Sequence, residues 1–161
     1  MTLVLHRIDD RLIHGQVVVG WGQPLDIGFI VLVDDAIAEN EWEQELYRMG
    51  VPVEMEVFFH DTAGALDALS RYRADARAGI LLTGDIATMQ RLVDAGGIPA
   101  VNLGGIHHRT GRTQRMRYVF LTADEAASLR AMAAGGVAVT AQDVPTARPV
   151  PLPDVLSGAA L

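Results

Sequence analysis

The residues best suited to chemistry lie in one short segment near the start of the chain, LHRIDDRLIHGQVVVGW. It contains two carboxylates (Asp9 and Asp10), a guanidinium (Arg11) and an imidazole (His14) that opens an apolar stretch. A neutral imidazole can attack phosphorus, and a guanidinium offers a planar fork, permanently charged, that suits phosphate oxygens. The segment is therefore typical of a site that carries a phosphoryl group on histidine.

The residues that follow predict how such a group would be held. A helix is expected after the histidine, and the backbone N–H groups of Gly15, Gln16 and Val17 are expected to face the phosphoryl oxygens. Gly15 has no Cβ to keep the backbone away. Asp9 or Asp10 is expected to hold the arginine in place or to fix the imidazole tautomer.

Two other interpretations of these residues stay open at this point. Asp-Asp-Arg before a helix can be an ordinary cap with a surface ion pair, and His14 a satisfied loop residue, because short motifs often match by chance. Asp9 or Asp10 could also work with His14 in an acid–base hydrolase. That alternative predicts turnover of a small substrate without a protein phosphodonor.

Composition excludes several classes of function. The chain has 161 residues, with 13 basic against 20 acidic residues and a net charge of −7, which disfavours binding to nucleic acid. It has no cysteine, which removes thiol nucleophiles and thiolate metal sites. Every basic residue is an arginine, so Schiff-base chemistry and a Walker-type phosphate loop are excluded as well.

Short apolar runs alternate with helical patterns along the chain. This alternation predicts an α/β fold: three layers, a mainly parallel central sheet with helices on both faces, and room for an antiparallel hairpin at one edge. Thr122 with Glu125 three residues later predicts a capping box. Expected strands are 3–8, 28–33, 53–59, 79–83, 100–103, 117–121 and 137–142, and expected helices are 15–22, 38–49, 62–74, 86–95 and 123–133.

The organisation predicted is a single domain over residues 1–161. Prolines at four positions in residues 145–161 predict an extended, poorly packed tail. Charged residues interrupt the N-terminal segment before a signal peptide could form. The longest apolar run, 27–33, is far shorter than the ~20 residues that span a bilayer. We therefore expect a soluble, cytoplasmic protein.

Four motifs together resemble a known family. RIDDRLIHGQV at 7–17 looks like the signature of the IIB component of the mannose/fructose/sorbose family of the bacterial sugar phosphotransferase system. VDDAIA at 33–38, NLGG at 102–105 and QDVP at 142–145 occur in the order and spacing of that family. The first motif is long and specific, whereas the later three are weak alone. The resemblance covers roughly residues 2–150.

The resemblance implies a defined chemistry. His14 would accept a phosphoryl group from a phosphohistidine on a separate IIA protein and pass it to a sugar held by the membrane components IIC and IID. The activity implied is that of a protein-Nπ-phosphohistidine–sugar phosphotransferase, although the residues alone do not indicate the nitrogen that is modified. Arg11 would neutralise the group in flight, and neither a metal nor another cofactor is implied. The sugar and any homo-oligomer stay undetermined.

A regulatory role is the alternative within the same family. His14 would then be phosphorylated, but its phosphorylation state would control another protein rather than sugar uptake. One departure from the family pattern bears on this alternative, because a Phe-Lys-like segment is replaced here by Thr83-Gly84-Asp85, which carries no cation. We expect either that the Thr83 hydroxyl binds the phosphoryl group or that Asp85 caps the next helix.

A basic segment, HHRTGRTQRMR at 107–117, reverses the sign of the charge locally. Its Thr-Gly centre predicts a turn and thus an exposed hairpin. Arg109, Arg112 and Arg115 are candidates for docking an acidic or phosphorylated partner. Alternatively, these arginines pair with surface acids.

Overall fold

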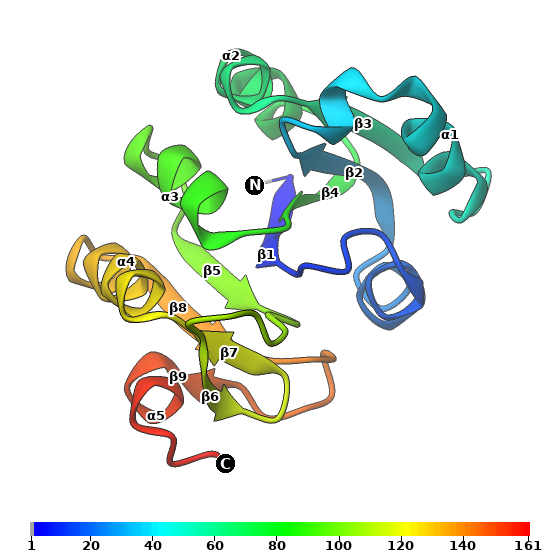
Figure 1. Ribbon diagram of the computed structural model, residues 1–161. Helices are drawn as coiled ribbons and strands as arrows, with labels where there is room; N and C mark the ends of the chain where they lie inside the picture. The colour runs from blue at the N-terminus through cyan, green and yellow to red at the C-terminus, as the bar shows by residue number, and fades with distance from the viewer. Residues whose placement is uncertain (1) are drawn as a thin grey trace.

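A seven-stranded sheet runs through the middle of the computed structural model, which describes residues 2–161 (Figure 1). The strand order is β3-β2-β4-β1-β5-β8-β9, and every neighbouring pair is parallel except β8 with β9. The predicted fold class is confirmed. The strands are β1 (Leu3–Ile8), β2 (Ile27–Val33), β3 (Glu56–His60), β4 (Ala78–Thr83), β5 (Ala100–Leu103), β8 (Ala138–Ala141) and β9 (Val150–Pro151).

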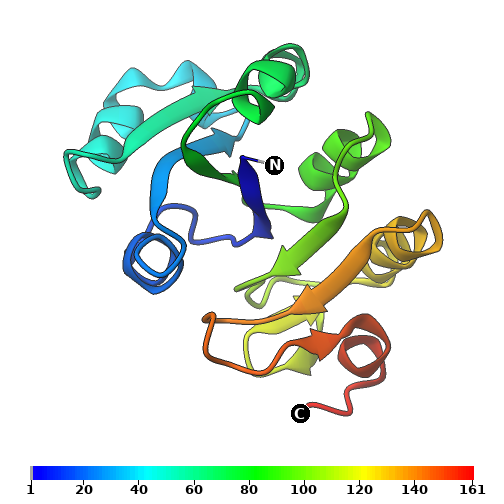
Figure 2. The same cartoon turned by 180° about the vertical axis from the view of Figure 1, so that it is seen from behind.

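Helices cover the two faces of this sheet, and each face has its own apolar core (Figures 1 and 2). On one face Leu69, Met89 and Leu129 bring α2, α3 and α4 against the sheet. On the other face Val17 and Ile37 bring η1 and η2 against it. The helices are η1 (Gln16–Trp21), η2 (Ile37–Glu39), α1 (Glu41–Met49), α2 (Thr62–Arg73), α3 (Ile86–Asp94), α4 (Ala123–Ala134) and α5 (Leu152–Ser157).

The central strands explain why the sheet needs both layers. β2 has the sequence IGFIVLV, and six of its seven residues are buried. A parallel strand that is covered on both faces is a continuous apolar run rather than an alternating one. None of the helices within residues 2–161 is long and apolar enough to cross a membrane.

Two local features differ from the sequence-based expectations. The helix expected after His14 is a π-helix, η1, whose wider turns sequence periodicity does not distinguish. The basic segment does form an antiparallel hairpin, β6 (Thr113–Met116) with β7 (Val119–Leu121), but it is a separate two-stranded sheet. It reverses direction between Met116 and Val119, which pair with each other, rather than at Thr110–Gly111. The predicted capping box at Thr122 is confirmed.

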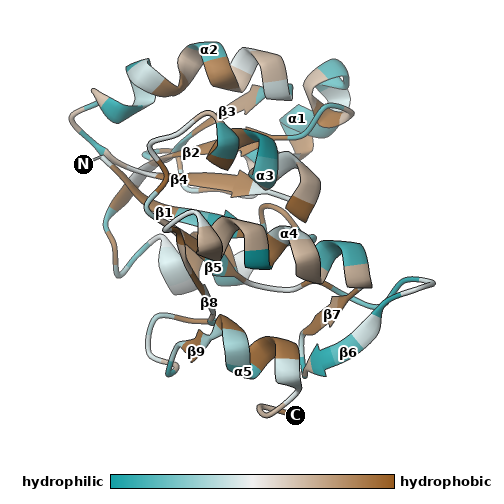
Figure 3. Cartoon of the chain, turned by 90° about the vertical axis from the view of Figure 1, so that its left-hand side faces the viewer, coloured by the Kyte–Doolittle hydropathy of each residue, from teal (hydrophilic) through white to brown (hydrophobic). Residues whose placement is uncertain are grey.

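The tail was predicted wrongly. Residues 145–161 are not an extended, poorly packed segment, because β9 pairs with β8 and α5 follows directly. Leu152 and Val155 on α5 are buried in the core beside α4 (Figure 3). Pro153 lies in the first turn of α5, where no intrahelical N–H is needed, and Gly158 ends the helix with φ of 74°. The prolines therefore start this helix rather than prevent it.

Truncation of Leu152 to alanine tests this packing. Leu152 is 5% exposed, so Leu152→Ala should lower the free energy of unfolding by about 2–4 kcal/mol. Leu161→Ala is the matched control, because Leu161 is 69% exposed and its truncation should change stability by less than about 0.5 kcal/mol. Equal effects in urea denaturation would contradict the docked position of α5.

Candidate functional site

Strand register brings the candidate residues to one edge of the sheet. Ile8 at the end of β1 pairs with Thr83 at the end of β4 and with Leu103 at the end of β5. The loops that follow these three strands therefore start side by side, as the carboxyl ends of parallel strands do. The loop after β1, residues 9–15, lies between the other two.

Asp9 is the centre of this loop. Its side chain has no solvent exposure, and it lies 3.1 Å from Nη2 of Arg7 and 3.1 Å from Nε of Arg11. The backbone N–H of Arg11 also donates to Asp9 Oδ1, at 3.2 Å. Nε2 of His14 lies 3.2 Å from Asp9 Oδ2. Burial raises the pKa of the Asp9 carboxyl, but contacts with His14, Arg11 and Arg7 outweigh it and hold that pKa well below its usual range.

Arg7 is the functional residue that the sequence analysis did not single out. Its guanidinium is fully buried, donates to the Asn102 side chain, and donates at 2.8 Å to the carbonyl of Gln142. It also lies 5.1 Å from the centre of the Trp21 ring. The motifs NLGG and QDVP thus supply partners to one buried cation. The sequence did carry one signal for this role, namely an arginine within the mostly apolar segment LVLHRI.

Gly104 shows how closely these groups are packed. A Cβ at this position would overlap the guanidinium of Arg7 and the carboxylate of Asp9. The second glycine of the motif, Gly105, faces the Arg11 side chain and His107 instead. Position 104 of the NLGG motif therefore requires glycine, because any side chain there would occupy the space of the buried Arg7–Asp9 ion pair.

His14 presents its two ring nitrogens to different partners. Nδ1 accepts a hydrogen bond from the Gln16 N–H at 3.3 Å, so a neutral ring carries its proton on Nε2. Nε2 is inaccessible to solvent and faces Asp9 without the alignment of a hydrogen bond. The His14 side chain is 19% exposed, and this exposure leaves out Nε2. Nε2 is thus enclosed by the protein, whereas Nδ1 faces the start of η1.

Arg11 and Gln16 are held together beside this ring. Arg11 is 40% exposed and donates to Gln16 Oε1 at 2.7 Å, while Arg7 reaches the same oxygen at 3.3 Å. The Gln16 side chain therefore bridges two guanidiniums, a role that the sequence analysis missed because it assigned Gln16 only a backbone N–H. The Val17 N–H donates to the carbonyl of His14 at 3.0 Å, and this bond replaces the phosphoryl contact expected for Val17.

Backbone conformation shapes the rest of the loop. Leu12 has φ of 60°, a left-handed conformation that is rare for a branched residue, and its side chain packs beside Gly84. Apart from its chain neighbours and the backbone of its own helical turn, no atom lies within 4 Å of the place where Gly15 would carry a Cβ. This open space lies at the start of η1, directly after His14.

Asp10 does not share the role of Asp9. Its carboxylate accepts from the His107 N–H at 2.7 Å and lies 2.6 Å from His107 Nδ1. It thus joins the loop after β1 to the basic segment, whereas the expected support of Arg11 comes from Asp9. Adjacent carboxylates in the sequence point to different partners here.

Thr83 was assigned wrongly to the phosphoryl group. Its side chain is completely buried, and its hydroxyl donates to the Asp85 carbonyl at 3.0 Å. Asp85 accepts from the Thr88 N–H at 2.7 Å and caps α3, which confirms the alternative interpretation of this loop.

The docking candidates in the basic segment separate into two groups. Arg112 is 7% exposed and forms two hydrogen bonds with Glu125, at 2.9 and 2.7 Å, and Arg115 donates to the Leu156 carbonyl at 2.8 Å. Both arginines therefore contact helices of this chain, Arg112 as the alternative pairing with an acid predicts, and a docking role for them stays a prediction. Arg109 is exposed and borders a hollow next to Asp10, where docking stays a prediction.

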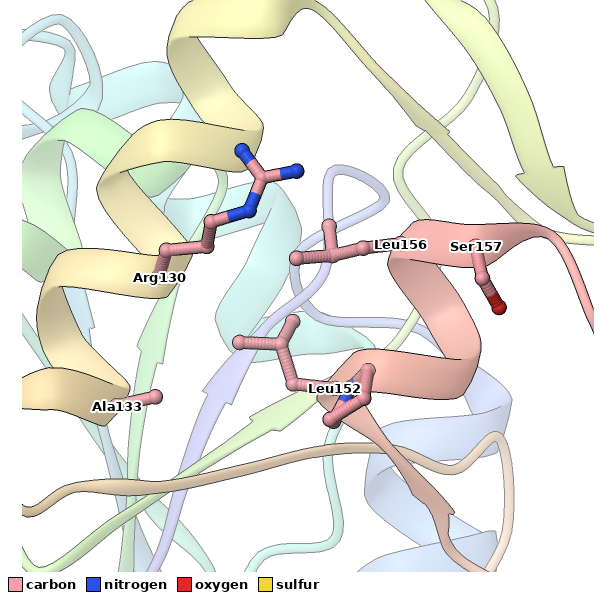
Figure 4. Close-up of a pocket in the computed structure, with 6 residues that line it drawn as sticks. Arg130, Ala133, Leu152, Leu156 and Ser157 are labelled. Atoms are coloured by element: carbon pink, nitrogen blue, oxygen red, sulfur yellow. The ribbon is translucent and has the colours of Figure 1, made fainter.

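An apolar hollow elsewhere on the molecule lies between α4 and α5, apart from the loop after β1 (Figure 4). Arg130 is the one charged side chain among the residues that line it. The lining therefore offers no acid–base pair, and its one hydroxyl, that of Ser157, donates to the Asp154 carbonyl at 3.2 Å. Within residues 2–161, no group of three or more His, Asp or Glu side chains is arranged to hold a metal ion.

The match to a family model decides the family of this chain. The model of the sorbose subfamily IIB component of the phosphotransferase system matches residues 3–161. The chain belongs to this family. The N-acetylgalactosamine-specific phosphotransferase enzyme IIB component 1 of Escherichia coli is 31% identical over 157 residues, which cover 95% of this chain and 98% of the relative.

Solved structures agree with this family. The IIB domain of the sorbose permease from Klebsiella pneumoniae has a TM-score of 0.89 at 26% identity and covers 100% of this chain and 99% of its own. The structure named manxB from Thermoanaerobacter tengcongensis has a TM-score of 0.86 at 30% identity, with 96% and 95% covered. The chain spans about half of one further relative, the mannose-specific EIIAB component of Escherichia coli, at 28% identity and 49% of that protein.

Gly104→Ala tests whether the buried ion pair fixes the loop. The added methyl group collides with Arg7 and Asp9, so it should lower the free energy of unfolding by about 1–3 kcal/mol and displace the His14 loop. Gly135→Ala is the control, because its added Cβ meets only ordinary contacts at 3.5 Å. Urea denaturation gives the stabilities and histidine NMR signals report the loop. An unchanged His14 signal in Gly104→Ala would contradict this prediction.

Proposed function

We propose that His14 carries the phosphoryl group in this phosphocarrier, on Nδ1. The chain is a IIB component of a sugar phosphotransferase system, and its family implies transfer of a phosphoryl group toward a sugar. The observation that carries the proposal for His14 is the arrangement of its ring. Nε2 is buried against Asp9, while Nδ1 faces the Gln16 N–H at the start of η1.

The transfer proceeds by displacement at phosphorus. The Nδ1 lone pair of His14 forms a bond to phosphorus as the bond from phosphorus to the donor imidazole breaks, and the donor nitrogen keeps the electron pair of that bond. The Nε2 proton of His14 stays in place. The ring becomes positively charged during this step, and the carboxylate of Asp9 beside Nε2 stabilises that charge.

Arg11 supplies the charge on the other side of the reacting group. Its guanidinium is partly exposed, and Asp9 and Gln16 fix its orientation. It therefore holds the phosphoryl oxygens without reorganising during transfer. The open space at Gly15 gives these oxygens room, and the Gln16 N–H, which meets Nδ1 before transfer, is the nearest backbone donor afterwards. Arg7 contacts Asp9 and Gln16 from the buried side and so stabilises the positions of both side chains.

The partners follow from the family. The donor is a IIA protein that carries a phosphohistidine, and the acceptor is a sugar bound to the membrane components IIC and IID. The name of the mannose-specific EIIAB component supports the IIA partner, because there a IIA and a IIB part share one protein. Relatives are named for N-acetylgalactosamine, sorbose and fructose, so we assign the choice of sugar to the membrane components.

Phosphotransfer in a purified system tests His14. With phosphoenolpyruvate, the two general phosphotransferase proteins and a cognate IIA, the wild type should acquire acid-labile phosphate and His14→Ala none. Arg11→Ala should slow labelling by about 10²–10³-fold, because it removes the charge that faces the phosphoryl oxygens. His108→Gln is the matched histidine control and should label like the wild type. Equal labelling of wild type and His14→Ala would reject His14 as the acceptor.

The nitrogen assignment has its own measurement. NMR of the labelled protein distinguishes the Nδ1 and Nε2 phosphohistidines, and we expect the Nδ1 form because Nε2 is inaccessible. A phosphoryl group on Nε2 would contradict the proposed mechanism while leaving His14 as the acceptor. Loss of label on adding sugar together with IIC and IID membranes is expected of transport. Retention of label under those conditions would favour the regulatory alternative.

A further inference from the structure

An apolar stripe lies on the outer side of α1 and continues into the turn that follows this helix. It is formed by Trp42, Leu46, Met49 and Val53, whose exposed fractions are 74%, 48%, 80% and 101%. Their spacing along the chain places the first three on one side of the helix. These four residues are called the α1 stripe below.

The outward direction of this stripe sets α1 apart from the other α-helices of residues 2–161. Helices α2, α3, α4 and α5 each bury at least two residues, whereas α1 buries none. Only Tyr47, on the opposite side of α1, packs against the core. An amphipathic helix normally turns its apolar side toward the core. An outward apolar side with a tryptophan and a methionine therefore indicates a surface that another molecule covers.

Acidic side chains surround the α1 stripe. Residues 39–56 contain six glutamates and one arginine, so this segment is strongly negative in a chain whose net charge is −7. The arginine, Arg48, is bound within the segment, because it pairs with Glu45 at 2.6 Å and lies 5.0 Å from the centre of the Phe59 ring. Four of the glutamates form no ion pair within residues 2–161, and these are Glu39, Glu41, Glu43 and Glu54. The surface thus combines an apolar centre with a negative rim.

The α1 stripe begins close to the edge of the sheet where the loop after β1 lies. Glu43, the residue after Trp42, lines the same hollow as Asp10 in that loop. From there α1 leads away from this edge beside β3, and Val53 lies three residues before β3 begins (Figure 1). A partner that reaches His14 over this edge can therefore contact α1 in the same complex.

Charge decides among the candidate partners. Anionic lipids and nucleic acid repel an acidic rim, and a second copy of this chain would bring the same glutamates together. Cytoplasmic loops of membrane proteins, by contrast, carry an excess of lysine and arginine. Such loops offer the charge that pairs with the rim, and apolar residues beside their cations can pack on the stripe.

We propose that the α1 stripe and its acidic rim are the docking surface for a basic cytoplasmic segment of the membrane components IIC and IID. The inference rests on the proposed function, because transfer to a sugar is what brings this chain to those components. It assigns the IIA protein no contact with the stripe, so the two partners that use His14 in turn differ in whether they need α1. Trp42 contributes most of the affinity, because tryptophan is enriched among the residues that dominate binding energy.

Kinetics of sugar phosphorylation test this surface. The concentration of this chain is varied with phosphoenolpyruvate, the general phosphotransferase proteins, excess cognate IIA, sugar and membranes that contain IIC and IID. The double variant Trp42→Ala/Met49→Ala should raise KM for the chain about ten-fold and leave kcat unchanged, because it removes binding without touching the reacting groups. Leu161→Ala is the matched control and should behave like the wild type, because Leu161 is 69% exposed and follows α5. Labelling by IIA should be the same for all three proteins.

Binding to membranes needs no phosphoryl group and separates the charged rim from the apolar centre. Co-sedimentation of the unphosphorylated full chain with membranes that contain IIC and IID should be about ten-fold weaker for the double variant. Glu41→Gln together with Glu54→Gln should weaken binding at low salt and reduce its dependence on salt, because exposed charges act mainly through screened, long-range attraction. Phosphatidylglycerol vesicles without IIC and IID are the control and should bind none of these proteins.

Four outcomes would overturn the inference. They are an unchanged KM for the double variant, an equal slowing of its labelling by IIA, equal binding of the wild type to vesicles without IIC and IID, and a wild-type dimer that the double variant abolishes. Normal labelling of His14 in the wild type together with any of these outcomes would reject only the docking surface. Binding to IIC and IID membranes that depends on Trp42, in a wild type that acquires no label, would reject only the proposed function.

Discussion

A single buried carboxylate organises this site. Asp9 has no exposed surface, and it faces the guanidiniums of Arg7 and Arg11 and the imidazole of His14. A buried charge is costly unless it is paired and hydrogen-bonded, and removal of one partner leaves the others uncompensated. The positions of Arg11 and His14 therefore depend on one another through the same group.

The sheet makes this arrangement accessible from one side only. Arg7 lies on the central strand β1. Its partners Asn102 and Gln142 lie on β5 and directly after β8, so it closes the site from the protein interior. Arg11 and His14 lie beyond the strand end, where solvent and a protein partner can approach. The two cationic side chains of the RIDDR motif thus have different tasks, although they flank the same acid.

Much of the fold followed from local sequence. Apolar runs marked the strands, and Thr122 and Asp85 marked helix starts through side-chain caps that act over three residues. The prediction of an extended tail is wrong because proline is compatible with the first turn of a helix, and Pro153 occupies that turn in α5. Sequence patterns predicted the structure correctly where the contacts that decide it join residues close together in the chain, as in these caps.

The site was only partly predictable for the same reason. Residues 9–14 indicate a candidate acceptor histidine, but the pairing of Arg7 with Asn102 and Gln142 joins residues 95 and 135 positions apart. The Gln16 side chain, the division of labour between Asp9 and Asp10, and the structural roles of Arg112 and Arg115 likewise depend on neighbours that a single segment does not reveal.

The long reach of Arg7 also bears on the order in which the molecule becomes functional. The carbonyl of Gln142 completes the surroundings of a side chain near the start of the chain. Contacts of such sequence separation form only after much of the chain has been ordered, because loop closure opposes them until the intervening elements pack. During synthesis, the loop after β1 thus emerges early and acquires its final shape late. A nascent chain has His14 long before it has the complete set of contacts around Arg7 and Asp9.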